Sequence, residues 1–509
     1  MRELSPTLLT AQKEASRIPY VRVTASNRVA GIVRLNWTRL YTGSEPDYFH
    51  ALAIPGDGSL VRVRITPPAD GRKLYHQRVA SPGPESDFSQ WTYSGQYNAV
   101  IVAAGSLGAE VSIFWIKSDR SVYQLKSTDY GASWGAPQLI DYSPTTAING
   151  IAACYRPNGD IGLFFADQDT LYAKQRLNDI WQDKTSWDKT SGELSGVAAC
   201  YDGDFNLFVT GQDPEGNFKL YSLIYGDGQE VPAGTWSELR EFARAPADGK
   251  FEYCQAFMDK PDVYRCFFAE KFSGTEAYTR PFWSHSVADT KFGDNLWREP
   301  VPFALSSEYG LAIAHHGSYG WLSHPGGVWR AKLSEESLDL SAALLNVRQE
   351  TEKEEGRLTV ELDSSRGQYA SPGEGELSAL DIGCQLEFSP GYVTPSGSEV
   401  SSGPAYWITA YEHASAHGKA SLILHALDGW NLIKNWRARH QLRWNKTGSQ
   451  MSVKDILAFV LARCGLKLTV KSQSPVLDSY YPDFVINPNS QGDAVVRRLL
   501  SFIPDVIFI

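Results

Sequence analysis

Acidic residues recur at one kind of position along the middle of this sequence, and they are its clearest candidates for chemistry. Carboxylate oxygens of this type bind calcium or sugar hydroxyls, and two carboxylates that flank a glycosidic bond can hydrolyse it. The alternative is that they are ordinary solvated turn residues, because Asp is common in turns. We favour turn residues over catalysis and keep a carbohydrate- or calcium-binding site open. The candidates are Asp119, Asp167, Asp169, Asp213, Glu215 and Glu270.

Other catalytic and metal-binding patterns are weak. The six cysteines lie apart, without a Cys-x-x-Cys pair. His413 and His417 are four residues apart, but Gly418 and the flanking patterns favour a hairpin turn over a helix. The order also does not fit His-Glu-x-x-His. We therefore expect no metal site, no cofactor and no catalytic residue of these classes.

The acidic positions belong to an internal repeat with a pitch of roughly fifty residues. The clearest copies are "GIAACYRPNGDIGLFFADQDTLYAKQ" from Gly150 and "GVAACYDGDFNLFVTGQDPEGNFKLYS" from Gly196. Each copy has a small-residue strand, a turn, an apolar strand, an acidic turn and a third strand. Weaker copies extend the pattern from Tyr48 to Leu333, and a tryptophan often closes the unit.

This length and order are typical of a four-stranded propeller blade. We therefore predict a mainly β chain with a β-propeller of about six blades at residues 46–333. Small residues suit the inner strands, where blades converge and backbones come close. In that arrangement the acidic turns, which join second to third strands, share one face. A β-sandwich with chance internal similarity is the alternative.

The stretch "STDYGASW", Ser127 to Trp134, resembles the Asp-box of sialidases and related propellers. We expect Asp129 to accept hydrogen bonds from turn amides, Gly131 to adopt a positive φ and Trp134 to pack on its blade. In such propellers the boxes lie opposite the catalytic pocket. The resemblance therefore implies architecture and a structural role for these four residues.

A second stretch, Arg17 to Pro19, resembles the Arg-Ile-Pro signature of a sialidase pocket. That resemblance also implies two arginines on inner strands, a Tyr/Glu pair and an acid/base Asp. The expected inner strands, "AACY", "VAAG" and "IAHH", contain no arginine. We therefore predict that the chain is not an enzyme, with a glycoside hydrolase or a lectin-like protein as the alternative.

Composition narrows the class further. The chain has 509 residues, 42% of them hydrophobic, which is enough for more than one domain. The formal net charge is −10 and no Lys/Arg run is present, which argues against a nucleic-acid binder. The N-terminus lacks an apolar stretch of signal length, and no run reaches membrane-spanning length. We expect a protein made in a cytoplasm.

The last third has a different pattern. Alternating segments such as "GRLTVEL" and "KASLILHAL" predict antiparallel strands. Asp428 is a candidate N-cap for a short helix, and Ser452 for the amphipathic helix that Gly465 ends. Ser490 is expected to cap a final helix in the same way, with Asp493 in its first turn. We predict an α+β body at residues 334–509.

The order "YWITAYE", "LILHALDGWNLIKNW", "SVKDILAFVLARCGLKL" and "PDFVINPNSQGDAVVRRLLSFIPD" resembles the tail hub proteins of tailed phages. "PYVRVTASNRVAGIVRLNWTRLYTGSEP" is similar to the opening strands of such a hub. The resemblance implies that residues 1–45 and 334–509 form one β-barrel-like and α+β body, interrupted by the propeller. It further implies a homotrimer at a virion tail tip or baseplate. The expected partners are tail tube, distal tail, tip or fibre proteins, with the propeller binding them or a host-surface glycan.

Overall fold

The computed structural model is mainly β, and the predicted β-propeller is confirmed. Among the described residues, no helix has the length and apolar character needed to cross a membrane. The structure describes residues 4–13, 18–29, 32–33, 35, 37–43, 48–143, 148–189, 192–229, 231–245, 249–260, 263–272, 280–285, 301–302, 311–324, 326–352, 354–416, 418–448, 451–471, 474–504 and 507. Arg17 of the Arg-Ile-Pro stretch lies outside them.

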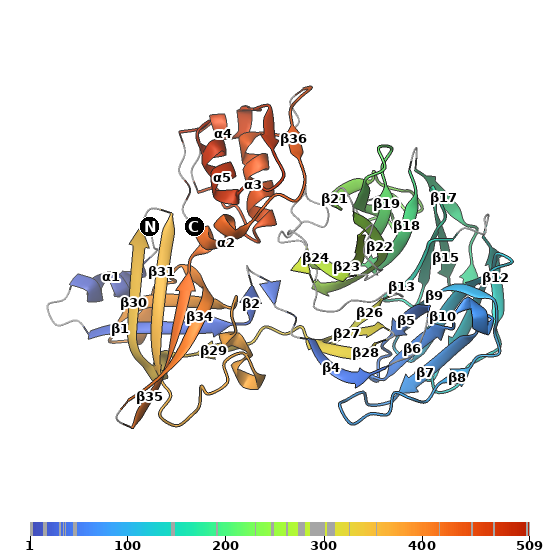
Figure 1. The fold of residues 1–509 in the computed structure, drawn as a ribbon, viewed down its shortest axis with the longest axis horizontal. Helices are drawn as coiled ribbons and strands as arrows, with labels where there is room; N and C mark the ends of the chain where they lie inside the picture. The colour runs from blue at the N-terminus through green and yellow to red at the C-terminus, as the bar shows by residue number, and fades with distance from the viewer. Residues whose placement is uncertain are drawn as a thin grey trace. The chain divides into compact units, whose positions relative to one another are not determined.

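The chain divides into two compact units, and the propeller is the continuous one, Leu35–Leu333 (Figure 1). Its described residues form five four-stranded sheets and one five-stranded sheet. The first two blades contain β5 Phe49–Ala53, β6 Leu60–Ile65, β7 Leu74–Val79 and β8 Thr92–Tyr93, then β9 Ala99–Leu107, β10 Glu110–Lys117, β11 Ser121–Ser127 and β12 Gln138–Tyr142.

The third and fourth blades are formed by the two clearest copies of the sequence repeat, which begin at Gly150 and Gly196. The third blade has five strands, because β15 pairs with both β16 and β17. Their strands are β13 Gly150–Tyr155, β14 Ile161–Ala166, β15 Thr170–Leu177, β16 Ile180–Trp181 and β17 Thr185–Asp188, then β18 Leu194–Tyr201, β19 Phe205–Gln212, β20 Phe218–Tyr225 and β21 Arg240–Arg244.

The last sheet is closed by a strand from the other end of the propeller sequence. In it β4 pairs with β28, so the propeller unit begins at Leu35 and not at the predicted residue 46. The remaining propeller strands are β22 Gly249–Lys260, β23 Val263–Phe272, β24 Arg280–His285 and β25 Val301–Pro302, then β26 Ala312–His316, β27 Tyr319–His324, β28 Gly327–Lys332 and β4 Trp37–Thr42.

The hydrophobic core of the propeller lies between neighbouring blades. Phe164 of the third blade and Phe205 of the fourth are fully buried, with ring centroids 5.3 Å apart. The inner strands approach so closely that a Cβ on Gly150 would lie 2.6 Å from the amide nitrogen of Val197. Small residues on these strands are therefore a packing requirement.

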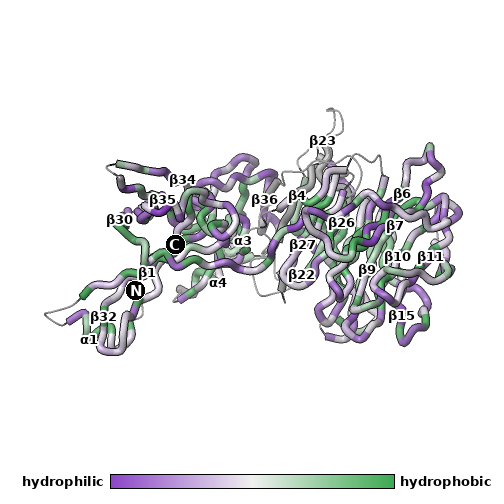
Figure 2. The backbone as a smooth tube through the Cα atoms, turned by 90° about the horizontal axis from the view of Figure 1, so that it is seen from below, coloured by the Kyte–Doolittle hydropathy of each residue, from purple (hydrophilic) through white to green (hydrophobic). Residues whose placement is uncertain are grey.

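The other unit, Met1–Arg34 with Ser334–Ile509, contains an eight-stranded antiparallel sheet. Here β1 pairs along its length with β32, from Ile18↔Val393 to Ser26↔Gln385. Much of β30 and of the β34–β35 hairpin is hydrophilic (Figure 2). The sheet contains β1 Ile18–Ser26, β29 Ser337–Asp339, β30 Leu344–Glu352, β31 Glu355–Asp363, β32 Gln385–Thr394, β33 Gly397–Val400, β34 Ala405–Ala416 and β35 Lys419–Leu427.

Helices make up much of the rest of this unit. Asp428 caps α2 through the N–H of Trp430, and Ser452 forms a capping box with Asp455 on α3. The predicted cap of the last helix is wrong, because Gln491 is its N-cap and makes no side-chain hydrogen bond. The elements are α1 Pro6–Lys13, α2 Gly429–Asn435, α3 Val453–Arg463, α4 Val476–Ser479, α5 Gly492–Leu500, the pairs β2 Arg28–Val29 with β3 Ile32–Val33 and β36 Leu442–Trp444 with β37 Phe484–Ile486, and 3-10 turns at Ser341–Ala343 and Gly375–Leu380. A further 3-10 turn, Pro68–Asp70, belongs to the propeller unit.

Candidate functional site

One end of the propeller gathers the turns that join second to third strands. Because successive strands are antiparallel, the segments leading from one blade into the next lie at the same end. We call this end the turn face. Asp119, Asp167, Asp169, Asp213 and Glu215 lie in its turns, as predicted from the repeat. Glu270 does not, because β23 continues through it and pairs it with Arg280; its side chain lies outside the described residues.

The two acidic residues of the third blade have local partners. The buried carboxylate of Asp167 accepts hydrogen bonds from the N–H of Thr170 at 3.0 Å and the hydroxyl of Tyr172 at 3.2 Å. Asp169 accepts a hydrogen bond from the Thr170 hydroxyl at 3.0 Å. Burial raises the pKa of Tyr172, and the Asp167 carboxylate adds to the effect. The two carboxylates therefore stabilise the turn between β14 and β15 through hydrogen bonds to neighbouring residues.

The acidic turns of the second and fourth blades behave similarly. Burial acts to raise the pKa of Asp213, but hydrogen bonds from Asn217 and Lys219 outweigh it and hold the pKa below its usual range. The Lys219 ammonium lies 2.9 Å from the Asp213 carboxylate. Asp119 accepts hydrogen bonds from the hydroxyl and N–H of Ser121, which lower its pKa. Glu215 is exposed.

These carboxylates do not line the pocket where the inner strands converge. Among the described residues that line that pocket, none is Asp or Glu. The lining is mainly small and apolar, with a few polar side chains. It includes Ile101, Ile151, Val197, Leu311, His50 and Gln255.

A more distinctive site lies on the turn face where the first two blades meet. The loop between β8 and β9 is held on both sides. The N–H of Asn98 donates to the carbonyl of Gly71 in the first blade at 3.1 Å. The N–H of Ser118 in the second blade donates to the carbonyl of Asn98 at 3.0 Å. Asn98 adopts a φ of 58°, which Asn tolerates better than most residues. The preceding residue, Tyr97, is thereby fixed between two blades.

Aromatic rings and cations are concentrated at this junction. Tyr97 is 59% exposed and Tyr93 45% exposed. The Lys117 ammonium lies 5.5 Å from the ring centre of Tyr97 and 4.6 Å from that of Tyr123. The ring of Tyr93 lies 5.3 Å from that of Tyr75. We call these residues, together with Arg64, the tyrosine junction.

Four members of the junction belong to a regular feature of the blades, namely Tyr75 with Arg64 and Tyr123 with Lys117. The third strand of each well-described blade carries an aromatic residue near its turn-face end, and a cation covers several of these rings. Arg64 lies 5.1 Å from the ring centre of Tyr75, Lys189 lies 5.0 Å from Tyr221 and Arg39 lies 5.1 Å from Trp329. The sequence shows this series as "KLYHQ", "SVYQL", "TLYAK", "KLYSL" and "GVWRA". This aromatic series was not predicted from the sequence, because the acidic turns are the more conspicuous feature of the repeat.

The Asp-box lies at the opposite end, between β11 and β12. The Asp129 carboxylate accepts hydrogen bonds from the N–H of Ser133 at 2.9 Å, the Ser133 hydroxyl at 2.6 Å and the Ser127 hydroxyl at 2.8 Å. These contacts, led by Ser133, lower the pKa of Asp129 to about 2. Gly131 has a φ of 82°, and the ring of Trp134 lies 5.1 Å from that of His76. The hydrogen bonds of Asp129 stabilise the hairpin between β11 and β12, and Trp134 packs against His76 of the first blade.

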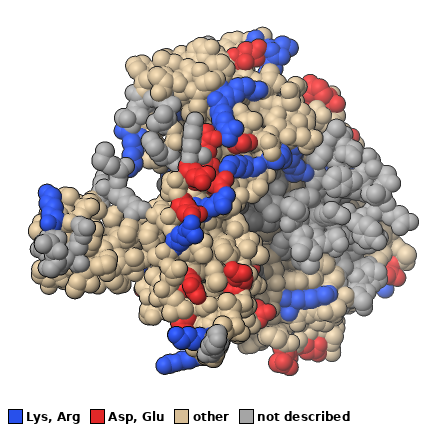
Figure 3. Space-filling view, turned by 60° about the vertical axis from the view of Figure 1, so that its left-hand side comes forward, with Lys and Arg blue, Asp and Glu red and all other residues tan. Residues whose placement is uncertain are grey.

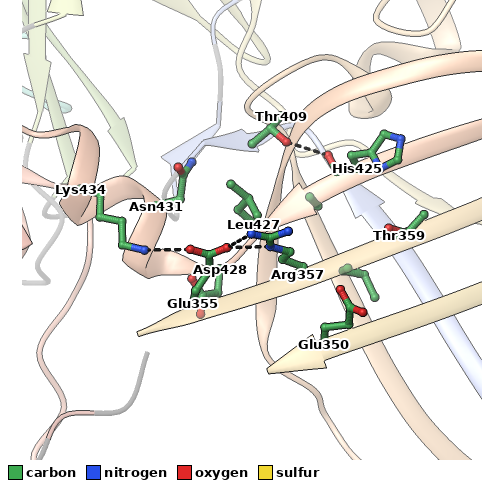
Figure 4. Close-up of a pocket in the computed structure, with 12 residues that line it drawn as sticks. Glu350, Glu355, Arg357, Thr359, Thr409, His425, Leu427, Asp428, Asn431 and Lys434 are labelled. Carbon is green, nitrogen blue, oxygen red and sulfur yellow. Dashed lines mark hydrogen bonds and ion pairs between the residues drawn. The ribbon is translucent and has the colours of Figure 1, made fainter. Parts of the chain in front are cut away.

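The other unit contains a polar pocket of about 360 Å³ between its sheet and α2 (Figure 4). Glu355 is central, with Arg357 Nε at 2.6 Å and Lys434 Nζ at 3.1 Å from its carboxylate. Glu355 thus pairs with a cation from the sheet and a cation from α2, and these contacts connect the helix to the sheet. Figure 3 shows that Lys, Arg, Asp and Glu side chains are interleaved on the surface in view.

In comparisons with known proteins, this chain resembles solved structures only in its propeller fold. No protein-family model and no curated protein matches the chain. A Penicillium chrysogenum α-L-arabinanase with arabinobiose is 10% identical, covering 60% of this chain and 98% of that one, with a TM-score of 0.38. Aleuria aurantia lectin with a fucosyl disaccharide is 11% identical, and the match covers 57% of this chain and 96% of the lectin, with a TM-score of 0.36. Podospora anserina α-L-arabinofuranosidase with cellotriose is 11% identical, and the match covers 50% of this chain and 98% of the arabinofuranosidase, with a TM-score of 0.34.

At these TM-scores the likeness bears on neither the activity nor the ligand of this chain. Nothing in the comparisons supports the resemblance to phage tail hubs. The homotrimer, the tail-protein partners and the virion location therefore stay predictions.

Proposed function

We propose that this chain is a lectin-like glycan-binding protein, and that the tyrosine junction is its binding surface. The observation that carries the proposal is the exposed ring of Tyr97, which lies beside the Lys117 ammonium, together with the exposed ring of Tyr93 on the neighbouring strand β8. A sugar ring offers an apolar C–H face and a rim of hydroxyl groups. A flat aromatic ring packs against that face, and nearby polar groups bind the rim.

Preorganisation favours this site over other exposed aromatic residues. The loop of Tyr97 is hydrogen-bonded to the turns of two blades, so little conformational entropy is lost when a ligand covers it. The carbonyl of Gln96 also accepts a hydrogen bond from Leu74, and Ser94 donates to the carbonyl of Leu74. A rigid loop of this kind suits recognition of a polar ligand.

A glycoside hydrolase is the competing function. Its general acid needs a raised pKa, so that it holds a proton near neutral pH. The pKa values of Asp119 and Asp213 are instead lowered by their hydrogen bonds. Asp167 is buried and bonded to Tyr172. Asp119, Asp167 and Asp213 are therefore suited to stabilising turns rather than to proton transfer.

A panel of immobilised poly- and oligosaccharides tests the proposal. We expect saturable binding to at least one glycan, without release of new reducing ends during prolonged incubation. Release of reducing ends would favour the hydrolase. The absence of binding to every glycan in the panel would overturn the proposal.

A further inference from the structure

We propose that the glycan bound at the tyrosine junction is anionic, carrying carboxylate or sulfate groups. This inference rests on the proposed function and specifies its ligand class. It is carried by the charge of the segments that build the junction, in a chain whose overall charge has the opposite sign.

Basic residues dominate these segments. The first-blade turn and the strand leading into it contribute Arg64, Arg72 and Lys73, and the second blade contributes Lys117 and Arg120. Two acidic residues, Asp70 and Asp119, lie in the same turns. The chain as a whole carries a formal net charge of −10. A local excess of positive charge on an acidic protein attracts an anion and orients its approach.

Hydrogen bonds bring these segments together. The loop of Tyr97 joins the turn of Gly71 to the turn of Ser118, and the N–H of Ala99 donates to the carbonyl of Arg72 at 3.1 Å. The backbone segments that carry Arg72, Lys117 and Arg120 therefore lie next to the loop of Tyr97, and the Lys117 ammonium itself lies over the Tyr97 ring. A ligand that stacks on Tyr97 would place its substituents among them.

Lys117 is the central cation. Its ammonium contacts the faces of Tyr97 and Tyr123, and cation–π contacts leave its full charge in place. The nearby Asp119 carboxylate accepts hydrogen bonds from the N–H and hydroxyl of Ser121, and the charge of Lys117 also helps to lower the pKa of Asp119. An incoming carboxylate or sulfate would form a charge-assisted hydrogen bond with the Lys117 ammonium.

The third blade shows that this charge is not a general property of the repeat. In the strand pairing, Trp115 faces Tyr123 and Phe165 faces Tyr172, so Lys117 and Asp167 occupy matching positions two residues later. The third blade thus has a buried carboxylate where the second has an ammonium. The positive charge at this position therefore distinguishes the second blade from the third.

Matched polysaccharides test the inference on the whole chain. Polygalacturonate is compared with its carboxyl-reduced form, and chondroitin sulfate with its desulfated form. We expect about tenfold or stronger binding to an acidic member of a pair, weakening as salt rises from 50 to 300 mM. Lys117→Gln should reduce that preference several-fold, whereas Lys419→Gln, at an exposed position in the other unit, should leave it unchanged.

The outcomes separate the two proposals. Equal binding of both members of each pair, or stronger binding of the neutral member, would overturn the anionic ligand and leave glycan binding standing. A preference for acidic glycans that Lys117→Gln does not change would also overturn the assignment to this junction. If no glycan of any charge binds, the proposed function itself fails.

Discussion

The N–H of Ser118 donates a hydrogen bond to the carbonyl oxygen of Asn98 at 3.0 Å, and this bond ties the second-blade turn to the loop that carries Tyr97. The same Asn98 donates its N–H to Gly71 of the first blade. One residue in a left-handed conformation therefore connects two blades. The position of the Tyr97 backbone is therefore set by these hydrogen bonds, and the Lys117 ammonium contacts the ring.

Asn98→Val tests this connection. A β-branched residue is disfavoured at a φ of 58°, so we expect a loss of about 1–2 kcal/mol in stability together with weaker glycan binding. Asn98→Gly, which accepts this backbone conformation, should retain binding. Thermal unfolding and glycan titration of both variants provide the comparison. Unchanged binding by Asn98→Val would show that the loop does not need this geometry.

The pKa of Asp129 predicts how acid affects the Asp-box. Its ordinary value of 3.8 applies to the unfolded chain, and the folded value is about 2. Because the folded value is lower, the stabilisation is complete above pH 3.8 and is lost as the pH falls toward 2. Melting temperatures from pH 6 to pH 2 should fall less steeply for Asp129→Ala than for the native chain. Parallel curves would contradict this role.

Gly131 faces two separate constraints, a φ of 82° and a Cβ position 2.8 Å from Cγ2 of Val61. We expect Gly131→Ala to cost about 1–3 kcal/mol. Gly58→Ala is the matched control, since Gly58 has a φ of 76° and open space around its Cβ position. It should cost less, about 1 kcal/mol. Chemical denaturation that ranks the two variants equally would mean that the contact with Val61 is readily relieved.

In the other unit, we expect hydrophobic packing to contribute more to stability than surface ion pairs do. Arg497 lies 2.6 Å from Glu354, but its side chain is 52% exposed, so Arg497→Met should change stability by less than about 1 kcal/mol. Leu499 on the same helix is fully buried, and Leu499→Ala should cost about 2–5 kcal/mol. Denaturation of both variants tests the order. A larger loss for Arg497→Met would contradict it.

The sequence predicts the propeller well because its signals are periodic. The matching "AACY" strands and the spacing of the Asp-box each reflect a local requirement of the propeller blades. In the other unit, the helix cap at Ser452 was predictable for the same reason, because capping depends on neighbouring residues. The start of the propeller was harder to place. The strand that closes the last sheet, β4, comes from a distant part of the sequence and pairs with β28. Local patterns carry no information about such a partner.

The proposed binding surface could not be recognised from the sequence, for a physical reason, and the role of the acidic candidates as a carbohydrate or calcium site stays a prediction. Asp is conspicuous in a sequence whether it binds a ligand or only stabilises a turn, and Asp167 turned out to be buried against Tyr172. Tyr93 and Tyr97 lie in "WTYSGQYNA", which reads as an ordinary linker. Their importance depends on hydrogen bonds to two other turns, which only the folded structure reveals.

Replacing Tyr97 tests the central claim most directly. Binding of the best glycan from the panel is measured for the native chain, for Tyr97→Ala and for Tyr411→Ala, an exposed tyrosine in the other unit. We predict a loss of about tenfold or more for Tyr97→Ala, with an unchanged melting temperature, and native binding for Tyr411→Ala. Native affinity in a folded Tyr97→Ala variant would show that the glycan binds elsewhere.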